Sequence, residues 1–154
     1  MGMTTFQSVD LEGVVLADAP IDPDWIIDGA PVAQSSEWVT SSDGLTTMAV
    51  WSCTAGTFRW TFGCDELVHI IEGEVIVTGA DGNRVRLGPN SAALFPAGSQ
   101  TTWEVPVFVR KHAILRAPVP APVRTVWRAL SATKRLVTGK GIRERPAGNE
   151  LLSR

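Results

Sequence analysis

The stretch ELVHIIEGEVIVTGADGNRVRLGPNSAALFPAG, residues 66–98, decides the fold class. Short runs rich in Val, Ile and Leu alternate in it with the turn sequences EG at 72–73, ADGN at 80–83 and PAG at 96–98. Short strands separated by glycine and proline turns are typical of an antiparallel sandwich or small barrel. No helical pattern interrupts them, so the stretch predicts an all-β domain.

The same pattern continues on both sides of this stretch. TTMAVWSC and TFRWTF precede it, separated by the turn signal TAG at 54–56, and TTWEV and VFVRKHAIL follow it. The opening FQSVDLEGVVLADAPIDPDWIIDGAPV mixes a short apolar run with Pro, Asp and Gly, which indicates an edge strand followed by an irregular arm. We therefore predict an N-terminal arm and edge strand over residues 1–40 and a single barrel core over residues 41–117.

The last part of the chain, residues 118–154, changes period and charge. In PVRTVWRALSATKRLV apolar residues recur at steps of three and four, which predicts a helix over residues 122–137, followed by a tail. Residues 110–154 hold eleven basic and two acidic side chains, whereas residues 1–109 hold three basic and fourteen acidic ones. A basic segment of this kind binds nucleic acid, an anionic membrane or an acidic protein surface. We favour the acidic body of the same or a neighbouring subunit, because the segment has few aromatic residues for stacking on bases.

Cysteine content and hydropathy bear on the cellular setting. The chain of 154 residues has two cysteines, Cys53 and Cys64, without a C-x-x-C pair. We expect both to be reduced thiols in a cytoplasmic protein. No apolar run reaches the roughly 18 to 20 residues of a membrane span, so we expect a soluble protein without membrane contact.

Residues 51–113 resemble the cupin superfamily, and within it the subgroup named for the ureidoglycine aminohydrolase cupin domain. Glu66 and Gly73 match the end of the first cupin motif, and the segment 96–98 matches the core of the second. The features shared with the subgroup are Trp25, Gly29, Trp51-x-Cys53, Trp103-Glu104-Val105 and Val109-Arg110-Lys111. The resemblance implies a double-stranded β-helix, or jelly-roll barrel, with a lumen open at one end and one added C-terminal helix. It also implies pairing of two barrels, so we expect a homodimer.

The histidines that hold a metal in many cupins are absent here. By the spacing that the resemblance implies, the two histidines of the first motif fall at Arg59 and Thr61, or at Trp60 and Phe62 with the shorter spacing. The third falls at Thr101. Glu66 alone keeps its residue type. A divalent metal needs several converging lone pairs, so we expect no cofactor; the alternative is a weakly held metal at Glu66, Thr61 and water.

Strand alternation places the remaining candidates. If Glu66 points into the lumen, then His69 faces the other way, and we expect it and His112 to be structural. By the same alternation we expect Arg59, Thr61, Glu66, Thr101 and Trp103 to line the lumen. An arginine and a glutamate on adjoining strands form a structural ion pair or present a guanidinium to a ligand, and both interpretations stay open.

Two functions follow from this set of residues. The first is a cupin that binds a small polar or anionic metabolite through Arg59 without the usual metal. The second is an enzyme, a hydrolase or isomerase similar to ureidoglycine aminohydrolase, in which Glu66 is the general acid or base and Arg59 stabilises developing negative charge. One barrel fold hosts many functions, so the sequence does not establish that there is a reaction. Cys64, beside Asp65, is not in an electropositive setting, and we expect no nucleophilic role for it.

Overall fold

The computed structural model describes residues 5–125 and confirms the all-β fold class. The chain separates into two compact units, Met1–Pro118 and Val119–Arg154. In the second unit, residues 121–125 are helical, and Thr125 Oγ1 donates to the carbonyl of Ala121. The remainder of the predicted helix, residues 126–137, and the predicted tail lie outside the described residues.

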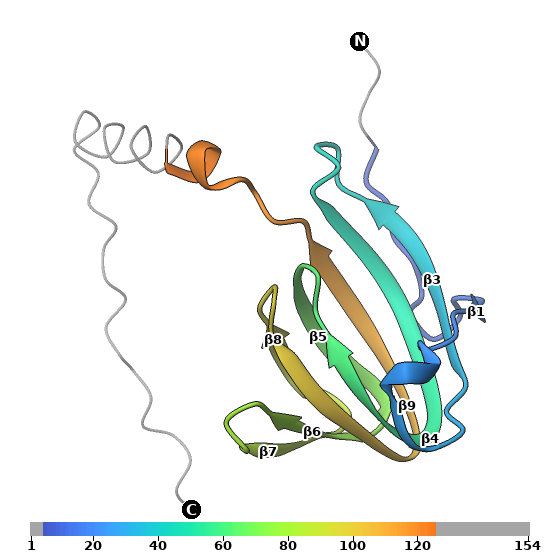
Figure 1. Ribbon diagram of the computed structural model, residues 1–154. Coiled ribbons are helices and arrows are strands. Elements are labelled where there is room, and N and C mark those ends of the chain that lie inside the picture. Colours follow the sequence, from blue (N-terminus) through green and yellow to red (C-terminus); the bar gives the residue numbers. More distant parts are fainter. Residues whose placement is uncertain (1–4, 126–154) are drawn as a thin grey trace, which may run out of the picture. The chain divides into compact units, whose positions relative to one another are not determined.

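Over residues 5–118, the described part of the first unit, the chain forms nine strands and one 3-10 turn (Figure 1). In chain order they are β1 (Ala17–Asp18), η1 (Pro23–Trp25), β2 (Ile26–Gly29), β3 (Ala33–Thr40), β4 (Thr46–Thr61), β5 (Asp65–Gly73), β6 (Val75–Gly79), β7 (Arg84–Leu87), β8 (Ala92–Phe95) and β9 (Gln100–Arg116). All the strand pairs are antiparallel.

Two long strands, β4 and β9, pair along their lengths and belong to both layers of the barrel. The first half of β4 and the second half of β9 continue into the order β1-β3-β4-β9-β5-β8. The second half of β4 pairs with β2, and the first half of β9 pairs with β6, which in turn pairs with β7. Because each long strand crosses from one layer to the other, residues far apart along β9 can meet in the space between the layers.

The sequence pattern predicted two short strands in place of each of these long strands. The residues TAG at 54–56, predicted as a turn, form an irregularity in the β4–β9 register instead, between Thr54 and Gly56. Between these positions β9 has two residues, Pro106 and Val107, opposite Ala55 alone, so the bulge lies in β9 and β4 continues through the turn signal. Pro106 likewise interrupts the sequence pattern of β9. Proline has no backbone N–H to donate, yet the strand continues through this position.

The N-terminal part contains more regular structure than the predicted edge strand and irregular arm. Strand β3, over Ala33–Thr40, pairs with β4 along its length and was not recognised in the sequence. Its residues AQSSEWVT lack the alternating apolar pattern of a typical strand. Upstream of β1, Arg110 holds the chain by donating from its terminal nitrogen to the carbonyls of Leu11, Glu12 and Val14.

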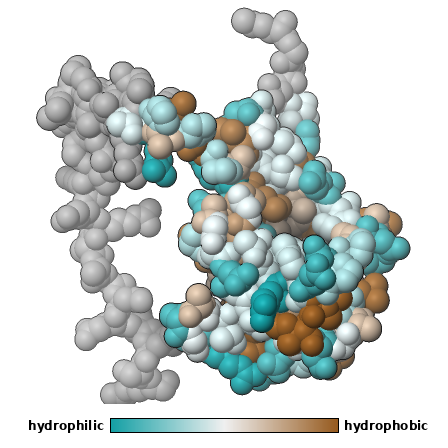
Figure 2. All heavy atoms as spheres, in the orientation of Figure 1, coloured by the Kyte–Doolittle hydropathy of each residue, from teal (hydrophilic) through white to brown (hydrophobic). Residues whose placement is uncertain are grey.

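Apolar side chains from both layers fill the space between them. Val50, Phe58, Val68, Ile70 and Val109 are each fully buried. On the face shown in Figure 2, the remaining hydrophobic residues form separate areas between hydrophilic ones. Burial of large apolar side chains is the main favourable contribution to folding, and here it also fixes which face of each strand points inward.

Gly73, the glycine of the first cupin motif, ends β5 with a positive φ of 70°. A Cβ at this position would lie 2.0 Å from the backbone oxygen of Phe108. Glycine is therefore required here both by the backbone conformation and by the close approach of β9. The second motif forms a tight turn in which Asp65 Oδ1 accepts a hydrogen bond from the amide of Ala97 at 2.8 Å.

Candidate functional site

The inward positions of β4 carry aromatic rings where the first cupin motif carries histidines. Phe58 pairs in register with Trp103, and Trp60 pairs with Thr101, whereas Arg59 pairs with Thr102. Phe58 is fully buried, and Arg59 is exposed. The predicted lumen position of Arg59 is therefore wrong, because side chains alternate and the neighbouring aromatic residues take the inner face.

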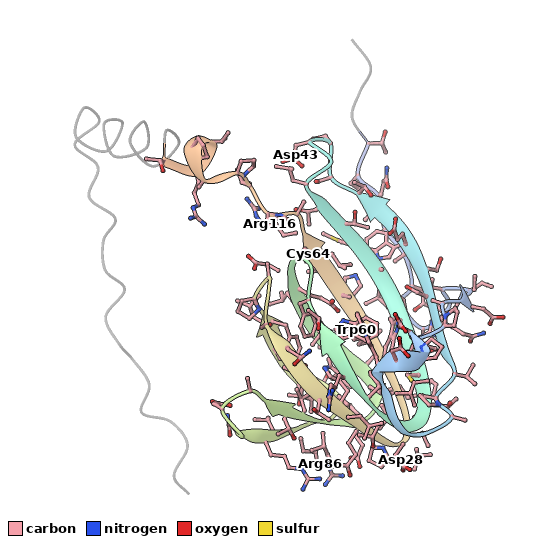
Figure 3. All side chains as sticks on the ribbon, viewed as in Figure 1. Asp28, Asp43, Trp60, Cys64, Arg86 and Arg116 are labelled. Carbon is pink, nitrogen blue, oxygen red and sulfur yellow. The ribbon has the colours of Figure 1, made fainter. Side chains whose placement is uncertain are left out.

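The predicted lumen position of Thr61 is also wrong. It is exposed and accepts a hydrogen bond from the Gln100 side chain at 3.2 Å. Phe62, the next residue, is buried and stacks on Phe95 with ring centroids 4.6 Å apart. Trp60 lies among the strands in Figure 3 and packs edge-on against Trp51. The shorter spacing of the motif, which puts Trp60 and Phe62 at the histidine positions, is the one that the structure adopts.

Glu66 points inward as the alternation predicts, and its partner is Lys111. In β5, Glu66, Val68 and Ile70 are buried while the residues between them are exposed. Lys111 Nζ donates to Glu66 Oε1 at 2.5 Å, with only 5% and 8% of the two side chains exposed. The carboxylate is thus neutralised by an ammonium group, and the arginine that the sequence suggested has no part in this pair.

Two indole rings flank the ammonium group of Lys111. Its Nζ lies 4.9 Å from the ring centroid of Trp51 and 4.7 Å from that of Trp103. A cation over an indole face is attracted by the ring quadrupole, by about 2 kcal/mol or more where water is excluded. Trp103 donates from its indole N–H to Thr101 Oγ1 at 2.9 Å, which fixes the orientation of the ring. We call Trp51, Glu66, Trp103 and Lys111 the lumen site.

Of the five predicted lumen residues, the structure brings Glu66, Thr101 and Trp103 to the inner face and leaves Arg59 and Thr61 outside. Lys111 is the residue that sequence reasoning missed. Counting by twos along β9 from Trp103 reaches Lys111, and this was the available signal, because both lie on buried positions of one continuous strand.

The ion pair leaves hydrogen-bonding capacity unused. An ammonium group has three donors and a carboxylate accepts at both oxygens. Within the described residues, the only hydrogen bond of the Lys111 ammonium goes to Glu66 Oε1, and Glu66 Oε2 accepts none. A small molecule with one acceptor and one donor could therefore bind to both residues at once.

The residues around Glu66 do not fit the divalent metal that other members of the fold hold. Such a site needs several imidazole or carboxylate lone pairs that converge on one point. Around Glu66 the structure places one ammonium group and two indole faces instead. Over residues 5–125, no three His, Cys, Asp or Glu side chains group together in a way that could hold a metal ion. The ammonium of Lys111 takes the place of a cation beside the carboxylate.

Both histidines lie on the outer face of the β5–β9 pair, directly opposite each other in register. His69 is exposed, as the alternation predicts, and His112 is half-buried. Trp38 donates from its indole N–H to His112 Nε2 at 3.2 Å. Burial, and next the nearby His69, lower the pKa of His112 below its usual value of 6.5. A neutral His112 is therefore part of the packing of this face.

The two cysteines are free thiols. Burial raises the pKa of Cys53 to about 11. Burial and then the carboxylates of Glu66 and Asp65 raise the pKa of Cys64, which lies just before β5 (Figure 3). A raised pKa keeps a thiol protonated and poorly nucleophilic, which agrees with the expectation that Cys64 does not act as a nucleophile.

The two-layered barrel, with its lumen between sheets that share β4 and β9, has the cupin jelly-roll fold. Residues 40–113, just under half of the chain, match the family model described as the EutQ-like cupin domain. Among curated proteins, no sequence matches this chain.

Solved structures agree with this fold. A DUF861-family protein of unknown function from Pseudomonas syringae pv. tomato has a TM-score of 0.64 and 21% identity, over 70% of this chain and 46% of that one. The chain thus spans less than half the length of that protein. The EutQ protein of Clostridium difficile has a TM-score of 0.58 and 20% identity, over 71% of this chain and 86% of its own. A putative ethanolamine utilization protein Q from Salmonella typhimurium has a TM-score of 0.50 and 23% identity, over 55% of this chain and 69% of its own.

At these identities the likeness concerns the fold alone. In the part of the chain that the structure describes, none of the helices has both the length and the apolar character needed to cross a membrane.

Proposed function

We propose that this cupin domain binds a small polar molecule in the barrel lumen through Lys111 and Glu66. The observation that carries the proposal is the buried ion pair, in which, among residues 5–125, Lys111 has donors and Glu66 has an acceptor oxygen without a hydrogen-bond partner. A structural pair would be expected to have its remaining hydrogen-bonding groups satisfied by the protein, because unsatisfied buried groups are costly. Trp51 and Trp103 would supply the apolar walls that most small-molecule sites have.

The charge of the lumen site favours an uncharged ligand over an anion. The preference for an anion came from Arg59, which lies outside the lumen. Glu66 and Lys111 together carry no net charge, so a full negative charge on the ligand would gain the attraction of Lys111 and meet the repulsion of Glu66. A neutral molecule that accepts from Lys111 and donates to Glu66 suits the pair best. Amides and hydroxy compounds have this combination of groups.

Ligand-observed NMR with glycolamide as the neutral probe and glycolate as the anionic one tests the proposal. We expect saturable binding of glycolamide, weaker binding of glycolate, and loss of both in the double variant Glu66→Leu/Lys111→Met. The matched control is Arg59→Gln, which removes an exposed charge and should leave binding unchanged. Equal binding by the double variant, or loss of binding in Arg59→Gln, would contradict the assignment of the site.

One of the two residues that the enzyme interpretation requires does not lie at the lumen site. It required Arg59 beside Glu66 to stabilise negative charge, and Arg59 is on the other face of β4. Assignment to the ureidoglycine aminohydrolase subgroup stays a prediction from the sequence motifs.

We also propose that the outer face of β5 and β8 pairs with a second copy of the chain. Leu67 and Leu94 lie directly opposite each other on these strands and are 44% and 60% exposed. In the sheet order β8 is an edge strand. At the end of this face Asp65 lies opposite Arg116, so the opposite charges allow the same surface to meet itself. We expect a dimer by light scattering, and a monomer for Leu67→Glu; a monomeric native chain would contradict the proposal.

For its location we propose the cytoplasm. The support is the presence of two free thiols, one buried and one half-buried, which a reducing compartment preserves. Quantitative thiol titration of protein purified without reductant tests this, and a mixed disulfide at Cys64 in the native source would contradict it.

A further inference from the structure

Lysine is rare in the part of the chain that contains the lumen site. Lys111 is the only lysine among residues 5–125, and the other two lysines of the chain are Lys134 and Lys140. The exposed cations of the body are arginines, among them Arg59 and Arg116. For a simple ion pair with a carboxylate, arginine offers the better geometry, because its guanidinium can donate two parallel hydrogen bonds. A lysine in this one place therefore suggests a role for the amine itself.

An amine can do chemistry that a guanidinium cannot. A lysine that transfers its proton to a neighbour becomes a nucleophile and forms imines with carbonyl compounds, whereas arginine stays protonated. Lys111 has such a neighbour, since its Nζ lies 2.5 Å from Glu66 Oε1, within direct reach for proton transfer. The two side chains are nearly buried, so little water is present to hydrolyse an imine.

The indole rings would suit the product as well as the free amine. The protonated imine keeps the positive charge at the position of Nζ, between the faces of Trp51 and Trp103. It also keeps the charge beside the carboxylate of Glu66. The stabilisation of the cation by the rings and the carboxylate is thus retained when the ammonium becomes an iminium.

We propose that Lys111 captures short-chain aldehydes as a reversible imine, with Glu66 as the proton carrier. The inference rests on the proposed function, because the aldehyde must enter the same lumen. Glu66 takes a proton from the ammonium, and the nitrogen lone pair attacks the carbonyl carbon. A proton moves from nitrogen to the former carbonyl oxygen, which gives a carbinolamine. Glu66 then returns its proton to that hydroxyl, the C–O bond breaks, and water leaves, so that the iminium is paired with the restored carboxylate.

Reductive trapping on the full-length chain tests this. The protein is incubated with propionaldehyde and cyanoborohydride at neutral pH, and the propylated lysines are located by peptide mass mapping over time. We expect Lys111 to be modified at lower aldehyde concentration than Lys134 and Lys140 and in a saturable way. Glu66→Gln should slow the modification of Lys111 by roughly a hundredfold, the low end of general acid–base effects, and leave the other two lysines unaffected.

Two further readouts keep the result decisive if Glu66→Gln unfolds. Excess glycolamide should protect Lys111, but not Lys134 or Lys140, from trapping in the native chain. Circular dichroism of each variant verifies the fold before mapping. Modification of Lys134 and Lys140 while Lys111 stays unmodified would overturn the inference, as would an unchanged rate at Lys111 in folded Glu66→Gln.

The outcome separates this inference from the proposed function. Binding of glycolamide without an imine at Lys111 overturns the imine and leaves the lumen site as a non-covalent one. An imine at Lys111 without glycolamide binding supports the inference and overturns the proposed ligand class. Absence of both overturns the two together.

Discussion

Removing one partner of the Lys111–Glu66 pair should be far more damaging than removing both. In Lys111→Met the carboxylate of Glu66 stays in a nearly sealed site without its counter-charge, and in Glu66→Leu the ammonium does. The double variant Glu66→Leu/Lys111→Met replaces the pair by apolar side chains of comparable size. The three variants and the native chain form a double-mutant cycle that isolates the pairwise free energy.

The magnitude follows from the distance between the charges. At the 2.5 Å between Lys111 Nζ and Glu66 Oε1, Coulomb attraction at an effective dielectric constant of about 20 is about 7 kcal/mol. Desolvation of each ion costs several kcal/mol, so the net contribution of the pair is close to zero. We expect each single variant to lower the free energy of unfolding by about 3 to 4 kcal/mol, and the double variant by no more than about 1 kcal/mol. The coupling is then about 6 kcal/mol.

Urea unfolding followed by tryptophan fluorescence measures all four chains, since two of the indoles lie at the pair itself. The control is the exposed pair Arg84–Glu104, whose side chains are 58% and 46% exposed. The same cycle there should give a coupling below about 1 kcal/mol. Additive effects at Glu66 and Lys111, or a double variant that is less stable than either single one, would refute the reasoning.

Other predictions concern the backbone, the histidine cluster and the thiols. Gly73→Ala should destabilise the fold by about 4 kcal/mol in urea unfolding, because its Cβ would lie 2.0 Å from a backbone oxygen. Gly82→Ala, with a φ of +80° and no atom within 4 Å, should cost only about 1 to 2 kcal/mol, and equal losses would contradict the steric argument. The pKa of His112 is lowered in the folded chain, so this residue contributes stability above the unfolded value of 6.5 that is lost as the pH falls below it. The fall in melting temperature on acidification should be smaller in His112→Gln, and an unchanged fall would exclude this contribution. Iodoacetamide should label half-buried Cys64 before buried Cys53, as mass mapping would show; simultaneous labelling would mean that the barrel opens as a unit.

The sequence correctly predicted which side chains point inward wherever the alternation along a strand was uninterrupted. Within β5 the alternation was unambiguous, so it put Glu66 inside and His69 outside, as the structure confirms. Between β4 and β5 the chain turns, and the number of residues in that turn decides which of Arg59 and Trp60 faces inward. A shift of one residue moves every side chain of a strand to the other face, which is why that single uncertainty misplaced both Arg59 and Thr61.

Lys111 was not predicted as a lumen residue for a different reason. Pro106 suggested that β9 was two strands, and the alternation that links Trp103 to Lys111 was therefore not followed across it. Even with the alternation in hand, the sequence could not have shown that Lys111 meets Glu66, because their contact depends on how β5 lies beside β9.

The sequence by itself determined the all-β class, the cupin motifs with their required Gly73, the inward direction of Glu66 and the loss of the metal-binding histidines. These are local properties, set by side-chain periodicity and by residue type at fixed spacing along one strand. Only the tertiary structure decided that the carboxylate is paired with Lys111 and that the pair lies between Trp51 and Trp103. That arrangement arises because β9 pairs with both β4 and β5, which brings side chains from three strands together in the space between the layers.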